Sequence, residues 1–183
     1  MKAPRTGARR IYNGRVISLD IEAVRFPDGS TGSLEMVRHP GASAVLPVLS
    51  DPIRETDPEI LLVRQFRHAA GDFIYEVPAG RLDDGEDPRH CAERELREET
   101  GCRAERLDPL ISFFTTPGFT DELIHAFVAL GVSRGEPSHE DDEFITVESL
   151  RLSSALAMVA DGRIVDGKTI ITLLFAARFG FGR

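Results

Sequence analysis

Residues 80–102 decide the fold of this chain, and they read GRLDDGEDPRHCAERELREETGC. We expect a helix from about Pro88 to Thr100 within this stretch. Asp87 suits the N-cap, and proline suits the first helical position because a backbone N–H is not needed there. Gly101 suits the C-terminal stop. The stretch therefore predicts one helix with a cap at each end.

The predicted helix places acidic side chains on its apolar side. Ala92 and Leu96 should face the core. At 100° per residue, Glu95 and Glu99 fall within the same third of the circumference, whereas Arg94 falls on the opposite side. Because an unpaired buried charge is costly, we expect a cationic partner beside the two acids.

A divalent metal ion is one such partner. Glu95, Glu98 and Glu99 are spaced at i, i+3 and i+4, and they repel one another unless a positive charge lies between them. Mg²⁺ takes oxygen ligands, usually one or two carboxylates with waters and substrate phosphates. The alternative is a surface helix in which Arg94 pairs with Glu98. That pair leaves Glu95 and Glu99 beside Leu96 unexplained, so the metal hypothesis is favoured.

The same stretch resembles the Nudix box, G-x5-E-x7-R-E-U-x-E-E-x-G-U, in which U is a bulky apolar residue. All seven fixed positions match, and only Cys102 is smaller than the usual residue at its place. Nudix enzymes hydrolyse a nucleoside diphosphate linked to another moiety. The resemblance implies an α/β (α+β) fold, namely an α/β/α sandwich with a mixed sheet.

The resemblance also implies roles for the box residues. Glu95 and Glu99 would be metal ligands, Glu98 would be a ligand or a catalytic neighbour of one, and the Ala79 carbonyl would add a further ligand. The expected cofactor is Mg²⁺, with Mn²⁺ as a substitute. The residues expected to support the motif are Gly80, Glu86, Arg94 and Gly101.

Two further segments resemble the ADP-ribose pyrophosphatase branch of the family. The first is Thr116–Glu122, in which Pro117 and Gly118 would contact the substrate, although Pro-Gly is also a plain turn dipeptide. The second is Val63–Arg67. There Arg67 would contact a substrate phosphate, and a structural salt bridge is expected for the neighbouring Arg64.

The N-terminal part reads as short strands separate from the main domain. Residues 17–24 nearly alternate between apolar and polar, Pro27–Gly29 supplies a turn, and Ser33–Arg38 reads as a returning strand. We therefore expect a small β-appendage over residues 1–40 and a Nudix domain over residues 41–183.

By resemblance, this appendage is similar to the small β-domain of dimeric family members. The chain would then be a homodimer in which Glu35 and Arg38 contact the substrate. A general base is expected in the acidic run at residues 140–143, with Glu143 the first choice and Glu140 the second. A solvated acidic loop is the alternative for that run. The chain has no Trp, so a nucleobase would stack on Phe, Tyr or Arg.

The remaining elements follow from apolar runs bounded by turn residues. Together they predict an α/β or α+β fold in which helices flank a mixed sheet. The strands expected after residue 40 are 44–49, 60–63, 74–77, 110–114, 123–130 and 143–147, and the further helices are 150–160 and 168–179.

The composition narrows the class of partner. A formal net charge of −8 argues against a nucleic-acid partner bound by charge alone. The longest apolar stretch, Ile170–Phe181, is too short for a membrane span and contains Arg178. Two cysteines, with no zinc-binding spacing, are expected to be reduced thiols in a cytoplasmic protein.

The expected function is metal-dependent hydrolysis of a nucleoside-diphosphate sugar, with ADP-ribose giving AMP and ribose 5-phosphate. GDP-mannose or another sugar nucleotide is the alternative substrate. A non-catalytic Nudix module that senses a ligand is the alternative from another class. Retention of every box acid argues against the sensor.

Overall fold

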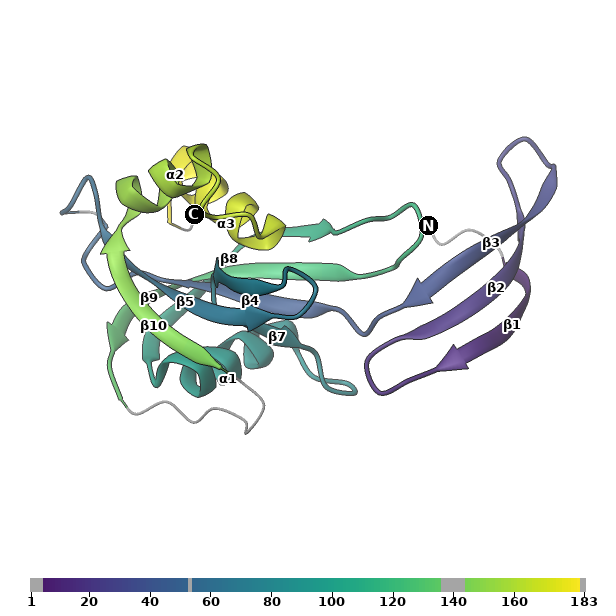
Figure 1. Ribbon diagram of the computed structural model, residues 1–183, viewed down its shortest axis with the longest axis horizontal. Helices are drawn as coiled ribbons and strands as arrows, with labels where there is room; N and C mark the ends of the chain where they lie inside the picture. Colours follow the sequence, from purple (N-terminus) through teal and green to yellow (C-terminus); the bar gives the residue numbers. More distant parts are fainter. Residues whose placement is uncertain (1–4, 53, 136–143, 182–183) are drawn as a thin grey trace. The chain divides into compact units, whose positions relative to one another are not determined.

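The chain divides into two compact units. The computed structural model describes residues 5–52, 54–135 and 144–181 (Figure 1). The first unit comprises Met1–Gly41 and Phe114–Leu123, and the second comprises Ala42–Phe113 and Ile124–Arg183. The grouping of residues 114–123 with the N-terminal strands was not predicted, because this contact is made only in three dimensions.

The first unit is an antiparallel sheet in the order β1-β2-β3, formed by β1 (Arg5–Asn13), β2 (Ser18–Arg25) and β3 (Thr31–Arg38). The later segment joins it through backbone bonds, including one from the Val37 N–H to the Phe119 carbonyl at 2.8 Å. Strand β1 was not predicted. It is an edge strand that is exposed over residues 7–13, so its sequence needs no apolar alternation.

The second unit contains a mixed sheet and a smaller antiparallel sheet. Their strands are β4 (Ala42–Pro47), β5 (Glu59–Arg67), β6 (Asp72–Glu76), β7 (Ala79–Arg81), β8 (Arg103–Phe114), β9 (Leu123–Ser133) and β10 (Ile145–Arg151). The mixed sheet has the order β7-β4-β9-β8, with β4 parallel to β9 and antiparallel to β7. The smaller sheet has the order β10-β5-β6.

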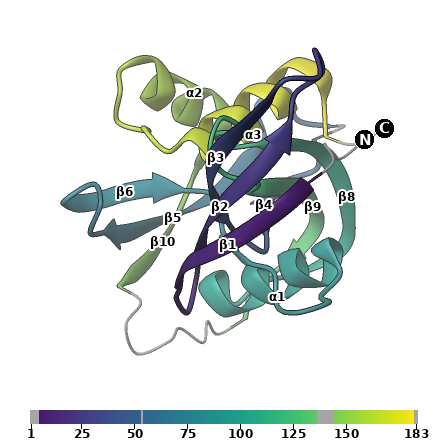
Figure 2. The same cartoon turned by 90° about the vertical axis from the view of Figure 1, so that its right-hand side faces the viewer.

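Helices cover both sides of these strands. Helix α1 (Pro88–Thr100) lies on one side, and helices α2 (Leu152–Ala160) and α3 (Gly167–Phe179) lie on the other (Figures 1 and 2). The expected α/β/α layering with a mixed sheet is therefore confirmed. Within the described residues, no helix is long and apolar enough to cross a membrane.

Alternation along β4 divides the core in two. Val45 packs in the cluster that includes Leu96 of α1, whereas its neighbour Leu46 packs in the cluster that includes Leu173 of α3. All four side chains are at most 1% exposed. Successive residues of a strand point to opposite faces, so one strand supports both helical layers.

The predicted helix of the box is confirmed with both of its caps. The Asp87 side chain accepts a hydrogen bond from the Arg89 N–H at 2.9 Å. Gly101 adopts a φ of 70°, and its N–H donates to the Arg97 carbonyl at 2.9 Å. A positive φ is easily adopted only by glycine, so the helix ends where the sequence indicates.

Several boundaries differ from the sequence prediction, and two of the differences have a clear physical reason. Strand β8 begins at Arg103 rather than at Leu110, because its exposed first half lacks an apolar run but still pairs with β9. Helix α2 begins at Leu152 rather than at Leu150, because Leu150 is still paired with Ile60 in the smaller sheet.

Candidate active site

The two inward acids of α1 form the centre of the candidate site. Glu95 is 8% exposed and Glu99 is 3% exposed, beside the fully buried Leu96. The Ala79 N–H donates to the Glu99 carboxylate at 3.2 Å. The expectation that both acids face the interior is confirmed, and the backbone that precedes the box lies directly against one of them.

Gly80 is required by the close approach of Glu95. A Cβ atom built on Gly80 would collide with the Glu95 carboxylate. The absence of a side chain therefore lets the strand β7 backbone lie against this acid. Gly80 was expected to meet a backbone need of the motif, and the structure shows that this need is space for a carboxylate.

Gly80→Ala is expected to displace Glu95 and to lower kcat by about 100-fold, the cost of an ångström-scale misplacement. The fold should survive, because the colliding group is the end of a flexible side chain. Steady-state kinetics and thermal unfolding measure the two effects. Gly7→Ala is the control, since a Cβ there meets nothing within 4 Å. A Gly80→Ala protein with full activity would show that Glu95 need not keep this position.

Arg94 connects the loop and the helix of the box through hydrogen bonds. Its Nε and Nη2 donate to the Glu86 carboxylate at 3.0 and 3.1 Å, and its Nη2 also donates to the Arg81 carbonyl at 3.1 Å. Its Nη1 donates to Glu95 at 2.5 Å and to Glu98 at 3.2 Å. The helical wheel placed Arg94 on the outer side, but its long side chain folds back over the loop.

The Glu86–Arg94 pair is charged at any physiological pH. The hydrogen bonds from Arg94 lower the pKa of Glu86 to about 2. Glu86 also accepts a hydrogen bond from the Asp83 N–H at 3.0 Å. The pair therefore fastens the loop before the helix to the helix itself, which agrees with the supporting role expected of both residues.

Glu98 lies among arginines in this structure. It accepts hydrogen bonds from Arg94 at 3.2 Å and from Arg97 at 3.1 Å, and its side chain is 34% exposed. Over residues 5–52, 54–135 and 144–181, no three His, Cys, Asp or Glu side chains form a metal-binding group. Arg94 thus pairs with Glu98, and Glu95 and Glu99 also face the interior. The two arrangements that the sequence offered as alternatives therefore both occur.

The donor set of the box still fits a hard divalent cation. Glu95 and Glu99 supply two buried carboxylates, and the Ala79 backbone lies beside Glu99. Mg²⁺ in enzymes is often held by one or two carboxylates, with waters and substrate phosphates completing its shell. Two inward carboxylates are therefore sufficient protein ligands for such an ion.

A buried acid on β6 organises a second group of charges. Glu76 is 1% exposed, and both of its oxygens accept hydrogen bonds from Arg67, at 2.6 and 2.9 Å. Glu76 also pairs with Lys168 at the start of α3, and Lys168 lies 3.1 Å from Asp166. The two cations are thus gathered around one buried carboxylate.

These charges lie next to the box acids. The hydrogen bonds to Glu76 raise the pKa of Arg67, and the negative charge of Glu99 adds to the shift. The Val77 N–H donates to the Thr169 hydroxyl at 2.8 Å, which fastens α3 to the chain just before the box. With a side chain 40% exposed, Arg67 can still reach a ligand in solution.

Comparison with known proteins identifies the family. The NUDIX domain model matches residues 40–172. This chain belongs to the Nudix family. It is 43% identical over 168 residues to the methanol dehydrogenase activator of Bacillus methanolicus, and 40% identical over 168 residues to the ADP-ribose pyrophosphatase of Bacillus subtilis (strain 168). Each match covers 91% of this chain and 88% of the relative.

The Nudix fold is also found among solved structures. The crystal structure of an ADP compounds hydrolase matches with a TM-score of 0.77 and 19% identity, covering 96% of this chain and 92% of the other. ADP-ribose pyrophosphatases of the Nudix family generally depend on a divalent metal ion. The two buried box carboxylates described above are consistent with such a requirement.

Glu76 and Lys168 were not singled out from the sequence. Lys168 was placed at the start of the expected last helix, with no role of its own. A signal for Glu76 was present, because it is an acid inside the apolar run 74–77 that reads as a buried strand. A charge at such a position requires a counter-ion. Which cations supply it could not be read from the sequence, because Lys168 is 92 residues away.

Arg64 does not make the salt bridge expected of it within the described residues. Its guanidinium carbon lies 5.3 Å from the centre of the Phe73 ring, which is a cation–π geometry. Arg64 and Arg67 contact different partners because their side chains point to opposite faces of β5.

The other predicted substrate contacts belong to the first unit. Arg38 donates to Asp121 at 2.6 Å and also pairs with Glu22, so it is held within that unit. Glu35 is exposed on β3. The segment that joins β3 from later in the chain exposes Pro117 and Gly118. The two candidate bases, Glu140 and Glu143, lie outside the described residues.

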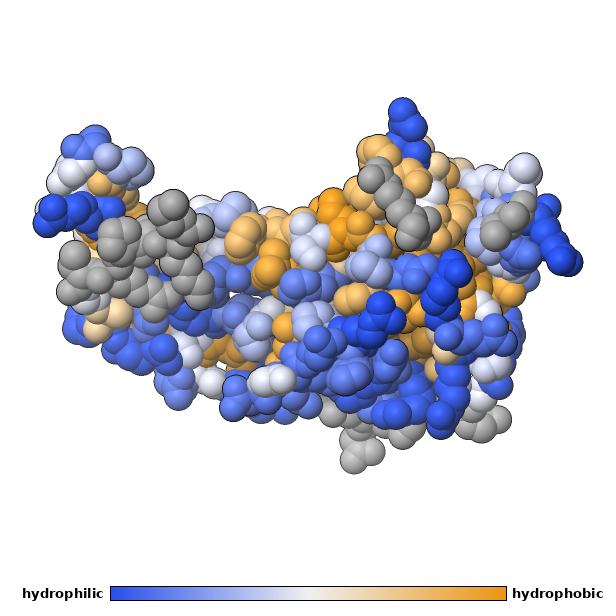
Figure 3. Space-filling model, turned by 180° about the vertical axis from the view of Figure 1, so that it is seen from behind, coloured by the Kyte–Doolittle hydropathy of each residue, from blue (hydrophilic) through white to orange (hydrophobic). Residues whose placement is uncertain are grey.

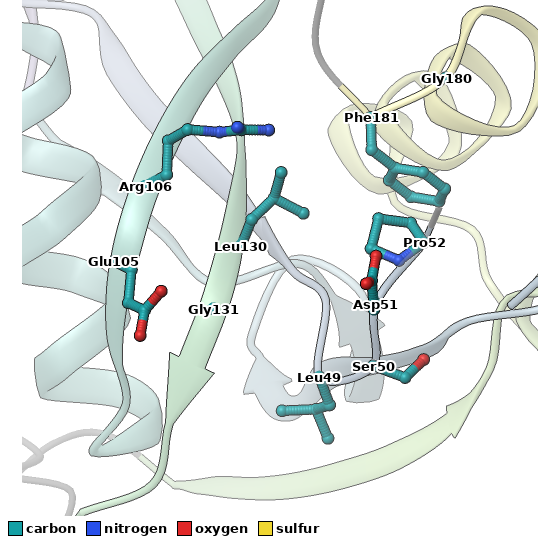
Figure 4. Close-up of a pocket in the computed structure, with 10 residues that line it drawn as sticks. All are labelled: Leu49, Ser50, Asp51, Pro52, Glu105, Arg106, Leu130, Gly131, Gly180 and Phe181. Atoms are coloured by element: carbon teal, nitrogen blue, oxygen red, sulfur yellow. The ribbon is translucent and has the colours of Figure 1, made fainter. Parts of the chain in front are cut away.

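A separate pocket of about 580 Å³ lies in the second unit (Figure 4). Its walls come from the loop after β4, from β8 and β9, and from the end of the chain. The lining residues include Leu49, Arg106, Leu130 and Phe181. None of its lining residues belongs to the Nudix box or to the charges around Glu76, so this pocket is not part of the candidate site.

Cys91 and Cys102 are both buried and make no disulfide. Burial raises the pKa of the Cys91 thiol to about 12. The thiolate is the reactive form of cysteine, so Cys91 is unreactive at neutral pH. It is a packing residue of the box helix rather than a nucleophile.

Proposed function

We propose that this Nudix protein is a metal-dependent hydrolase of nucleoside-diphosphate sugars, with ADP-ribose as the substrate and AMP and ribose 5-phosphate as the products. The complete box, with Glu95 and Glu99 turned inward beside Ala79 and Gly80, carries the proposal. The 40% identity to an ADP-ribose pyrophosphatase over nearly the whole chain supports the choice of substrate.

The proposed cofactor is Mg²⁺, held by Glu95, Glu99 and the Ala79 carbonyl. When bound, the ion supplies the positive charge that a diphosphate needs during hydrolysis. Arg67 would bind a substrate phosphate with the exposed part of its guanidinium, while Glu76 fixes the orientation of that group. Bidentate geometry makes arginine well suited to phosphate.

The test is a substrate panel of ADP-ribose, GDP-mannose, NADH and 8-oxo-dGTP with Mg²⁺, followed by product identification. ADP-ribose should give the highest kcat/KM. EDTA should abolish turnover, and Mg²⁺ or Mn²⁺ should restore it. A preference for GDP-mannose would mean that GDP-mannose, and not ADP-ribose, is the substrate. Full activity after exhaustive chelation would refute the metal proposal. No turnover of any substrate would favour the ligand-sensing alternative.

Glu143 is the proposed general base, and Glu140 is the second choice. A positioned base contributes about 10²–10⁴-fold to rate, so Glu143→Gln should lower kcat by about that factor. The affinity for Mg²⁺ should be unchanged, which separates a base from a metal ligand. Glu140→Gln is the matched control. If only Glu140→Gln is impaired, Glu140 is the general base. If neither variant is impaired, Glu98 is the next candidate for the general base.

A second candidate function rests on the 43% identity to a methanol dehydrogenase activator. The chain would then also raise the rate of a methanol dehydrogenase. Adding the protein to the Bacillus methanolicus dehydrogenase tests this directly. Activation that is lost in Glu99→Gln would depend on the box, whereas activation that persists would come from another surface.

We also propose that residues 1–40 form a dimerisation appendage and that the protein is a homodimer. In this proposal Glu35 and Arg38, together with Pro117 and Gly118, contact the substrate. A rise in KM with unchanged metal dependence is the expected effect of Arg38→Ala. The oligomeric state follows from sedimentation velocity of the full chain.

A further inference from the structure

A fully buried hydroxyl joins helix α3 to the backbone just before the Nudix box. Hydrophilic residues cover much of the visible surface in Figure 3, but Thr169, at the start of α3, is 0% exposed. Its Oγ1 accepts a hydrogen bond from the Val77 N–H at 2.8 Å and donates one to the Asp166 carboxylate at 2.6 Å. Val77 is also 0% exposed. The bond between Thr169 and Val77 is thus closed to water, which could not replace it if it were lost.

The chemistry of the two partners requires a hydroxyl between them. A backbone N–H can only donate a hydrogen bond, and a carboxylate can only accept one. A group that serves Val77 and Asp166 at once must therefore accept on one side and donate on the other, as a hydroxyl does. Asp166 also caps the helix, because it accepts a bond from the Thr169 N–H at 2.9 Å. The helix cap therefore sets the position from which the hydroxyl meets Val77.

The backbone held by this bond leads directly into the proposed metal site. Val77 is two residues before Ala79, and Pro78 between them has a fixed φ, which makes the segment stiff. At the other end of the segment, the Ala79 N–H donates to Glu99 of α1 at 3.2 Å. Helices α1 and α3 lie on opposite sides of the strands. Residues 77–79 are therefore held from both helical layers, by Glu99 on one side and by Thr169 on the other.

We propose that Thr169 is a positioning residue for the metal site. In this role it binds neither the ion nor the substrate, and it holds residues 77–79 where the Ala79 carbonyl can bind the ion. This role rests on the proposed function, in which Glu95, Glu99 and the Ala79 carbonyl hold Mg²⁺. Residues that orient metal ligands change metal affinity or activity by about 10–100-fold when they are replaced. Loss of the Thr169 hydroxyl should therefore weaken metal binding as well as catalysis.

Thr169→Val removes the hydroxyl and keeps nearly the same shape. Binding of Mn²⁺ to the full chain without substrate is followed by electron paramagnetic resonance, so the measurement does not depend on turnover. We expect the affinity for Mn²⁺ to fall about 10-fold, the lower end of the range for a residue that orients ligands. Thr169→Ser restores the hydroxyl without the methyl group and should bind Mn²⁺ as wild type does. If Thr169→Val does not fold, Thr169→Cys takes its place, because a thiol is only a weak donor and acceptor.

Thr172→Val is the matched control. Thr172 lies on the same helix and is also 0% exposed, but its hydroxyl donates to the Lys168 carbonyl of that helix at 2.7 Å. Loss of this bond removes a buried hydrogen bond of α3 without freeing residues 77–79. Thr172→Val should therefore lower the unfolding temperature while leaving the affinity for Mn²⁺ unchanged.

Amide hydrogen exchange examines the bond itself in the absence of metal. The Val77 N–H should exchange faster in Thr169→Val than in wild type or in Thr169→Ser. Wild-type affinity for Mn²⁺ in folded Thr169→Val would overturn the proposal, whatever the exchange rate at Val77, and so would an equal loss of affinity in Thr172→Val. A wild-type chain that binds no Mn²⁺ is a different result, because it refutes the proposed metal site and this role of Thr169 with it.

Discussion

Glu99→Gln is expected to lower kcat by about 100-fold or more, and to raise the Mg²⁺ concentration needed for half-maximal activity. Residues that only support a metal ligand cost 10–100-fold when changed, and a ligand should cost at least as much. Glu99 is 3% exposed and accepts a hydrogen bond from the Ala79 N–H. Glutamine keeps the shape and one acceptor oxygen but removes the charge that would hold the ion.

The fold of the Glu99→Gln protein should be as stable as wild type or more so. In the absence of metal, the change removes one of the like charges on α1. Glu93→Gln is the control, since Glu93 is an exposed acid on the same helix. The measurements are a Mg²⁺ titration of activity and denaturant unfolding with EDTA. Near wild-type kcat at low Mg²⁺ would rule out Glu99 as a ligand.

Glu76→Gln should have the largest effect on stability, lowering the free energy of unfolding by about 2–3 kcal/mol. Removing one partner of a fully buried ion pair costs about 3–5 kcal/mol. We expect less here, because the Arg67 side chain is 40% exposed and water compensates part of the loss. Lys168 is only 14% exposed and would lose its buried partner.

The loss of stability caused by Glu76→Gln should be larger at neutral pH than at acid pH. Although burial opposes ionisation of Glu76, hydrogen bonds from Arg67 and the charge of Lys168 hold its pKa below the usual 4.5. A lowered pKa stabilises the fold above pH 4.5 and less as the pH falls through the folded value. The difference in the free energy of unfolding between wild type and Glu76→Gln should therefore become smaller at acid pH.

Urea unfolding at pH 7 and pH 4 measures both effects of the Glu76→Gln change. Asp161→Asn is the control, because Asp161 pairs with Arg163 at the surface and should matter little. Equal stability of wild type and Glu76→Gln at pH 7 would mean that the buried carboxylate is not needed to hold the two cations. A fall in kcat/KM at unchanged stability would instead point to Arg67 and its phosphate contact.

The layers and the box could be predicted because their signals are local. The helix Pro88–Thr100 depends on a cap, a proline and a glycine within a few residues of its ends. The inward placement of Glu95 and Glu99 follows from the helical period alone. The prediction of strands fails where the apolar pattern is weak. Strand β1 is an example, because it lies exposed at the edge of its sheet and its side chains need not be apolar.

The sequence by itself determined which acids share a face of the helix, since spacing within one helix fixes this, and the resemblance of residues 80–102 to the Nudix box implied the reaction class. Only the tertiary structure decided what surrounds those acids. Arg94 reaches back to Glu86 because its side chain is longer than a helical wheel can represent. Glu76 meets Lys168 across 92 positions of sequence. Such contacts depend on how strands and helices pack, and packing joins residues whose separation along the chain carries no periodic signal.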